Sequence, residues 1–221
     1  FQLDIRDIFR FQPDLRSNES ILALSRNYVR GSINVSGNLS SLRVPKASIS
    51  WGNTKLDAVA SLQNITDTKN IAFDISTFHA NTEKQDLIAF VNEEELGLDL
   101  PEDISLVGNA KGNLNNLEVN AELTTSQGIA VAKGFWVNDQ GIDFSADVEI
   151  KEYKLNELLK NDALGTLSFK LHTNGSGDDI NHLNMDLDAN LIHLSFNDYP
   201  INDLNLIAKI KDGEGNLNTV Y

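Results

Sequence analysis

Cysteine and clustered positive charge are both missing from this 221-residue sequence, and each absence narrows its possible functions. With no cysteine, a disulfide framework and cysteine-ligated metals are excluded, which fits a bacterial protein in any compartment. Lys and Arg number 18 against 32 Asp and Glu, giving a formal net charge of −14. That charge argues against nucleic-acid binding, which needs clustered cations, and against simple attraction to an anionic membrane surface.

Long apolar runs are also missing. The longest purely apolar stretch is about as short as the five residues 87–91, whereas a membrane-spanning helix needs about 20. Residues 1–6 read as a strand and lack the basic and apolar regions of a signal peptide. The sequence stops as abruptly, at residues 217–221. We therefore expect an internal segment of a longer protein, with any targeting information outside it.

Alternation of apolar and polar residues runs through most of the chain and predicts β-strands. The longest uninterrupted series contains the apolar residues Ile142, Phe144, Ala146, Val148 and Ile150. Turn signals separate the alternating runs, among them Gly52-Asn53, Gln127-Gly128 and Asn174-Gly175. Their spacing indicates antiparallel hairpins rather than βαβ units. The sequence therefore predicts an all-β fold.

Helical spacing of apolar residues is confined to two short segments, residues 86–93 and 154–160. A sheet with one apolar face has to cover it with helices, a second sheet or barrel closure, and here the helices are too few. Roughly 15 strands at ~4.8 Å each would make a sheet about 70 Å long, which calls for strong curvature. Alternation alone favours an ordinary sandwich or barrel core, but the sheet could also fold over and hold something else.

A repeated pattern, G-N-L-x-x-L-x-V, occurs at residues 37–44 and again 75 residues later at 112–119, with a looser copy at 177–185. Each copy follows an alternating strand, and each of those strands is preceded by a short apolar and acidic turn. The order of elements indicates repeats of about 65 to 75 residues. We predict the end of a preceding β-repeat at 1–30, β-repeats at 31–105 and 106–165, and an incomplete repeat at 166–221, together forming one continuous β-groove.

The segments that carry these repeats, residues 30–44, 107–128 and 164–210, resemble the periplasmic β-repeats of TamB proteins in the AsmA-like superfamily. The version found in Bacteroidetes is the most similar, and the resemblance extends over nearly the whole sequence. It implies an elongated, curved antiparallel sheet of repeated hairpins, folded into a taco-shaped or U-shaped groove with an apolar interior and two short helical turns.

The resemblance also implies a function. It predicts a non-catalytic segment of a cell-envelope protein that carries phospholipid between the inner and outer membranes, or supports the translocation and assembly of outer-membrane proteins. The expected partners are phospholipid acyl chains and, through regions outside this segment, a BamA-like outer-membrane barrel. The expected location is the periplasm, in a protein held by an inner-membrane helix that precedes this segment.

A groove for lipid needs a continuous apolar floor for acyl chains. Because each buried CH₂ contributes about 0.8 kcal/mol, sliding between equivalent apolar positions should be nearly isoenergetic. The residues predicted to line the floor are Ile33, Val35, Ile49, Phe73, Leu117, Val119, Phe144, Val148, Phe169, Leu171, Met185, Leu187, Leu204 and Leu206. The opposite face should carry Ser, Asn, Asp and Lys, which keeps the body soluble.

We predict no catalytic residues, no metal site and no cofactor. The sequence has no G-x-S-x-G, P-loop or dinucleotide fingerprint, and its acids are spread evenly rather than gathered at one cleft. The acidic loops at 178–181 and 212–216 lack EF-hand spacing and are interpreted as solvated turns. Histidines are expected on the polar face rather than as ligands, at positions 79, 172, 182 and 193.

One alternative function stays open at this point: a structural or adhesive surface β-repeat protein whose apolar face is a closed hydrophobic core. An enzyme, for example one acting on carbohydrate, is a weaker alternative, since only 7% of the residues are aromatic. If the floor and the sheet edges are exposed, the isolated segment should also be able to dimerise.

Overall fold

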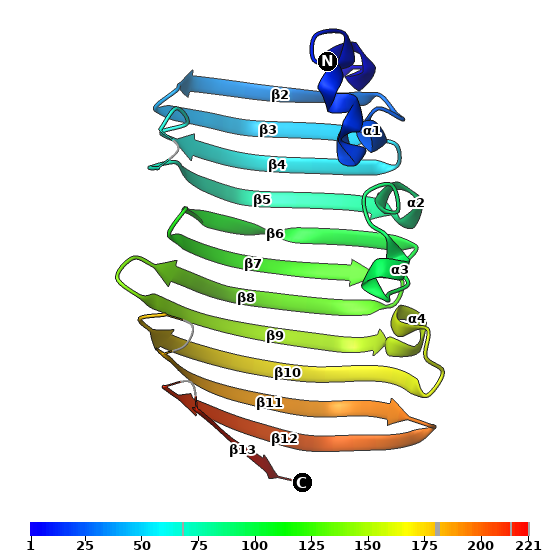
Figure 1. Ribbon diagram of the computed structural model, residues 1–221, viewed down its shortest axis with the longest axis vertical. Helices are drawn as coiled ribbons and strands as arrows, with labels where there is room; N and C mark the ends of the chain where they lie inside the picture. Colours follow the sequence, from blue (N-terminus) through cyan, green and yellow to red (C-terminus); the bar gives the residue numbers. More distant parts are fainter. Residues whose placement is uncertain (68, 180–181, 213, 221) are drawn as a thin grey trace.

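A computed structural model describes residues 1–67, 69–179, 182–212 and 214–220, the last four of these as backbone only. Its strands form one open antiparallel sheet in which strands that follow one another in the sequence are always neighbours in space, from β1 to β13 (Figure 1). The predicted all-β class and the antiparallel hairpins are confirmed. The described residues form 13 strands rather than about 15, and the longest strands, β10 and β11, have 14 residues each.

The strand bounds follow the alternating runs of the sequence. They are β1 (Gln2–Leu3), β2 (Val29–Asn38), β3 (Ser41–Trp51), β4 (Thr54–Gln63), β5 (Ala72–Glu83), β6 (Asp103–Asn113), β7 (Asn116–Thr125), β8 (Gly128–Asn138), β9 (Ile142–Lys154), β10 (Leu164–Gly177), β11 (Leu183–Phe196), β12 (Tyr199–Lys211) and β13 (Glu214–Val220). The turn predicted at Asn174-Gly175 is wrong, because both residues lie inside β10.

Short helices interrupt the strand order. They are η1 (Ile5–Arg10), η2 (Pro13–Ser17), α1 (Glu19–Leu24), α2 (Lys84–Leu87), α3 (Glu93–Leu96) and α4 (Leu155–Leu159). The helical segment predicted at 86–93 is wrong over most of its length, because only residues 86–87, in α2, and residue 93, in α3, are helical. The one predicted at 154–160 corresponds to α4. The strand predicted at residues 1–6 is wrong beyond Leu3, because the Asp4 side chain caps η1 by accepting a hydrogen bond from the Arg6 backbone N–H at 2.9 Å.

The helices all lie at one end of the strands (Figure 1). At this end, helical connections (β1–β2, β5–β6, β9–β10) alternate with tight turns (β3–β4, β7–β8, β11–β12), so a helical connection recurs every four strands. The hairpins built on the G-N-L pattern lie at the other end, since they join β2–β3, β6–β7 and β10–β11. The division into segments 1–30, 31–105, 106–165 and 166–221 stays a prediction.

The G-N-L pattern is explained by turn geometry. Asn38 Oδ1 accepts hydrogen bonds from the backbone N–H groups two and three residues further on, at 2.9 and 3.0 Å. Asn113 does the same in the next copy, at 2.8 and 3.0 Å. A Cβ added to Gly37, Gly112 or Gly177 would overlap a carbonyl oxygen where the following strand begins. The Gly and Asn of the pattern are therefore needed to make the hairpin.

The dry core of the described residues is small. Its buried apolar side chains are Ile5, Phe9, Ala23 and Trp51. The Trp51 indole Nε1 donates a hydrogen bond to the Leu24 carbonyl oxygen at 2.7 Å, and the ring lies 5.3 Å, centroid to centroid, from that of Phe90. This core lies where the N-terminal helices and the segment after α2 meet the end of β3, which leaves most of the sheet outside it.

The exposed surface agrees with a single-layer sheet. The chain of 24.4 kDa exposes 14261 Å², whereas a compact globular protein of that mass exposes about 10,000 Å². The closed core of a sandwich or barrel, on which the structural or adhesive alternative rested, is absent from the described residues. The folding of the sheet into a U-shaped groove stays a prediction.

Candidate functional site

The pairing register places every predicted floor residue on one face of the sheet, because directly paired residues in an antiparallel sheet point to the same side. One row of paired residues crosses the sheet through Ile33, Ala47, Ala58, Phe78, Gly108, Ala121, Ala132, Val148, Leu171, Ala189 and Leu206. Parallel rows contain the other predicted residues apart from Val35. Val35 has no single partner, because it lies opposite the bulge at Val44-Pro45, but it alternates in β2 with Ile33 and Gly37, which both belong to these rows. We call this surface the apolar face.

The apolar face has further large members that the prediction did not include, among them Leu42, Leu56, Phe78, Leu106, Trp136 and Ile210. Most of these continue an alternating run and could have been found from the sequence. Phe78 could not, because a bulge between Ile75 and Phe78 changes which positions of β5 point to this face.

The apolar face has no cover in the described part of the chain. None of the predicted floor residues is buried. Ile33, Val35 and Leu117 are 43, 53 and 39% exposed, and the others are half-buried by their neighbours within the sheet. Apolar side chains this open to solvent, contiguous over a whole sheet face, are typical of an interaction surface rather than a core.

Aromatic rings fill the space above glycines on this face. A Cβ added to Gly108 would lie 2.9 Å from Cζ of Phe78, its cross-strand partner. A Cβ added to Gly175 would lie 2.7 Å from Cε1 of Phe144, which is likewise its cross-strand partner. Because the rings lie across the neighbouring strand, the apolar face has no gap at these glycines.

The opposite surface, the polar face, carries the alternate residues of each strand. Cross-strand ion pairs join Lys111 to Glu118 at 2.9 Å and Asp186 to Lys209 at 3.1 Å. The hydrogen bond from Lys111 to Glu118 raises the pKa of the lysine. These pairs are exposed and worth little in stability, but they keep the surface hydrophilic.

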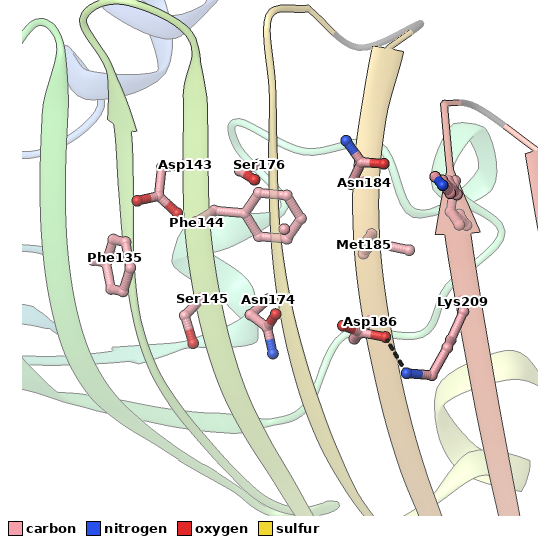
Figure 2. Close-up of a pocket in the computed structure, with 13 residues that line it drawn as sticks. Phe135, Asp143, Phe144, Ser145, Asn174, Ser176, Asn184, Met185, Asp186 and Lys209 are labelled. Carbon is pink, nitrogen blue, oxygen red and sulfur yellow. Dashed lines mark ion pairs between the residues drawn. The ribbon is translucent and has the colours of Figure 1, made fainter.

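A shallow hollow of about 410 Å³ lies between β8 and β12 (Figure 2). Its polar-face side chains include Asp143, Ser145, Asn174 and Lys209, with the ring of Phe135 at one side. Asp186 and Lys209 are paired with each other there, and nothing in the arrangement joins a nucleophile to a base. The hollow therefore offers hydrogen-bonding groups without a catalytic constellation.

At the end of the strands where the helices lie, the buried carboxylate of Asp86, in α2, forms hydrogen bonds with the β3–β4 turn. Asp86 is 7% exposed. Its Oδ2 accepts three hydrogen bonds of 2.8 Å, from the backbone N–H groups of Asn53 and Thr54 and from the Thr54 hydroxyl. Because these bonds satisfy donors that the turn leaves unpaired, Asp86 has a structural role.

Asp99 lies in the connection between β5 and β6 and contacts the neighbouring connection between β9 and β10. Its carboxylate pairs with Lys84 of α2 and lies 3.7 Å from Lys160 Nζ, just after α4. Its backbone N–H donates to the Leu158 carbonyl at 2.7 Å, and its own carbonyl accepts from the Gln127 side chain at 3.2 Å. The hydrogen bond from Lys84 lowers the pKa of Asp99, and the same bond raises the pKa of Lys84.

The histidines are separate from one another and each has a nearby polar neighbour. His172 Nδ1 lies 2.7 Å from Asp147 Oδ1, and His193 Nδ1 lies 2.7 Å from Asn202 Oδ1. Within the described residues, no group of three or more acidic or histidine side chains is placed to hold a metal ion. The acidic loops at 178–181 and 212–216 include positions 180, 181 and 213, which lie outside the described residues.

No helix in the described ranges is long and apolar enough to cross a membrane. Comparison of the chain with protein-family models, with curated proteins and with solved structures finds no match. The apolar face is therefore the feature of the molecule from which a function has to be argued.

Proposed function

We propose that this chain is a segment of a TamB-like periplasmic protein, and that its apolar face is the wall of a groove that carries phospholipid acyl chains between the inner and outer membranes. The same groove would serve outer-membrane protein assembly, with a BamA-like barrel as the distant partner. The polar face would lie toward water. No cofactor or catalytic step is part of this function.

The observation that carries the proposal is the uncovered apolar face. Its rows run across strands β2 to β12 without a charged residue among the directly paired positions that contain Val148 or Phe144. An acyl chain lying along such a row would exchange one set of apolar contacts for an equivalent one as it moves. Since each buried CH₂ contributes about 0.8 kcal/mol, burial of the acyl chain would lower its free energy substantially. Its position along the row would change that free energy little.

Charge substitutions on the two faces test the proposal. Phe144→Asp and Leu187→Asp place a carboxylate on the apolar face, next to positions where acyl chains would lie. Ser145→Asp is the matched control, because Ser145 follows Phe144 in β9 and points to the polar face. Phospholipid in each purified protein is measured by extraction and mass spectrometry, and β-content by circular dichroism.

We expect both apolar-face variants to lose at least ten-fold in bound phospholipid while keeping their β-content, since neither side chain is buried in the free sheet. Ser145→Asp should bind like the unmodified chain. Equal lipid content in Phe144→Asp and Ser145→Asp would contradict the proposal. Unfolding of both apolar-face variants would indicate a closed core instead.

A further inference from the structure

The apolar face finishes differently at the two ends of the strands. We call the end with the described helices the helical end, and the opposite end, with the G-N-L hairpins, the hairpin end (Figure 1). The two tryptophans of the chain belong to the apolar face and lie one at each end, Trp51 at the helical end and Trp136 at the hairpin end. Trp51 is 7% exposed, whereas Trp136 is 37% exposed. The apolar face is therefore covered around Trp51 and open around Trp136.

The cover at the helical end comes from the connections between strands. The Leu24 carbonyl, at the end of α1, accepts the hydrogen bond of the Trp51 indole, and Phe90, just after α2, lies against the same ring. Thr54 is the direct cross-strand partner of Trp51, and its hydroxyl donates to Asp86 of α2 at 2.8 Å. Segments of two connections are thus held on the apolar side of the sheet, and they occupy the space at the ends of β3 and β4.

The hairpin end presents apolar side chains without such a cover. Leu39 and Leu114, which are the leucines of the G-N-L pattern, are 63 and 60% exposed at the hairpin tips. The hairpins need the Gly and Asn of the pattern for their geometry, but not the Leu. A single exposed leucine needs no explanation, whereas the same position in two hairpins indicates a contact. Trp136 lies at this end as well, and an indole favours the boundary between an apolar region and water.

Charge also distinguishes the two ends. α3, at the helical end, contains three consecutive glutamates at 93–95, of which Glu94 and Glu95 are exposed. The G-N-L tips at 38–40 and 113–115 contain no charged residue, and the β8–β9 turn adds a single acid, Asp139. The phosphate of a phospholipid is anionic, so it would be repelled more strongly beside α3 than beside the G-N-L tips.

We propose that the groove opens at the hairpin end only. The headgroup of a bound phospholipid lies beside Leu39, Leu114 and Trp136, and its acyl chains lie on the apolar face between these residues and the helical end. This inference rests on the proposed function, because it places the headgroup of a lipid that the groove has to bind. It adds that the two ends have different roles: the hairpins form the entrance that faces water, and the helical connections form the closed wall.

Single cysteines measure where the headgroup lies, since the chain has no cysteine of its own. Leu114→Cys and Leu96→Cys are a matched pair, because these leucines are 60 and 54% exposed and lie beyond opposite ends of β6. β6 alone, at 11 residues, spans about 37 Å. Each variant carries a fluorophore on its cysteine and is incubated with vesicles of phosphatidylcholine that has a nitroxide on the headgroup. After removal of the vesicles, quenching is measured, and bound lipid is measured by mass spectrometry.

We expect the nitroxide to quench the fluorophore of Leu114→Cys about three-fold or more strongly than that of Leu96→Cys, because quenching is short-ranged compared with the length of β6. Equal quenching of the two lipid-loaded variants, or stronger quenching of Leu96→Cys, would overturn the opening at the hairpin end and leave the proposed function standing. Variants and unmodified chain that all take up no lipid would contradict both.

The tryptophans provide a second measurement that needs no label. In the lipid-loaded unmodified chain, the same nitroxide lipid should quench the indole emission through Trp136. Trp136→Phe keeps an aromatic ring on the apolar face and leaves Trp51, buried at the other end, as the remaining indole. Quenching per bound lipid should therefore fall about two-fold or more in Trp136→Phe. Undiminished quenching in lipid-loaded Trp136→Phe would overturn the proposal.

Discussion

The ring of Phe144 (Figure 2) occupies the space above Gly175, so that the largest side chain of that part of β9 lies against a glycine of β10. The two residues are direct cross-strand partners on the apolar face. A Cβ on Gly175 would lie 2.7 Å from the ring and 2.8 Å from the Asn184 carbonyl oxygen. The glycine therefore serves packing, and the turn that an Asn-Gly pair usually makes does not form here.

Gly175→Ala is expected to lower the free energy of unfolding by about 1 to 3 kcal/mol, because the new methyl group forces the Phe144 ring or the backbone of the next strand to shift. The measurement is urea unfolding followed by circular dichroism. Gly215→Ala is the control, since a Cβ there meets only Ile210 Cγ1, at 3.7 Å. If the two variants unfold at the same urea concentration, the packing role of Gly175 is wrong.

The Asp99–Lys84 pair makes stability depend on pH. The pKa of Asp99 is lowered in the folded chain by the hydrogen bond from Lys84, while in the unfolded chain it is about 3.9. The pair therefore stabilises the fold above about pH 4, and its contribution is lost as the pH falls through the lowered pKa.

Asp99→Asn should consequently lower the melting temperature near neutral pH and have a smaller effect in strongly acidic solution, where the native aspartate is itself protonated. Differential scanning fluorimetry over a pH series measures both. Asp139→Asn, in the exposed turn between β8 and β9, should follow the unmodified chain throughout. A deficit of Asp99→Asn that is the same at every pH would contradict the ion-pair explanation.

Alternation in the sequence was sufficient to predict most of the strands and the side of the sheet on which the floor residues lie. Ile142, Phe144, Ala146 and Val148 alternate without interruption, and their directly paired neighbours all belong to the apolar face. Where a bulge changes the alternation, as it does before Phe78, the period alone gives the wrong side. A bulge depends on how a strand pairs with the next strand. The sequence of one strand alone does not contain that information.

The helical segments were harder to predict for a different reason. α1 has a readable start, since the Asn18 side chain accepts a hydrogen bond from the Ile21 backbone N–H at 3.1 Å, but a helix of 6 residues has too few turns to display a period. The structural role of Asp86 could not be predicted from the sequence either, because its hydrogen-bond partners in the β3–β4 turn are more than thirty positions away. That the apolar face binds lipid stays a prediction.

The most direct test of lipid binding is native mass spectrometry of the unmodified chain, produced in the periplasm of a bacterium and purified without detergent. The proposed function predicts that a substantial fraction of the intact protein carries additional mass, and that collision-induced release yields ions of cellular phospholipids. Protein that appears only at the mass of the bare chain, and takes up no phospholipid when incubated with vesicles, would contradict it.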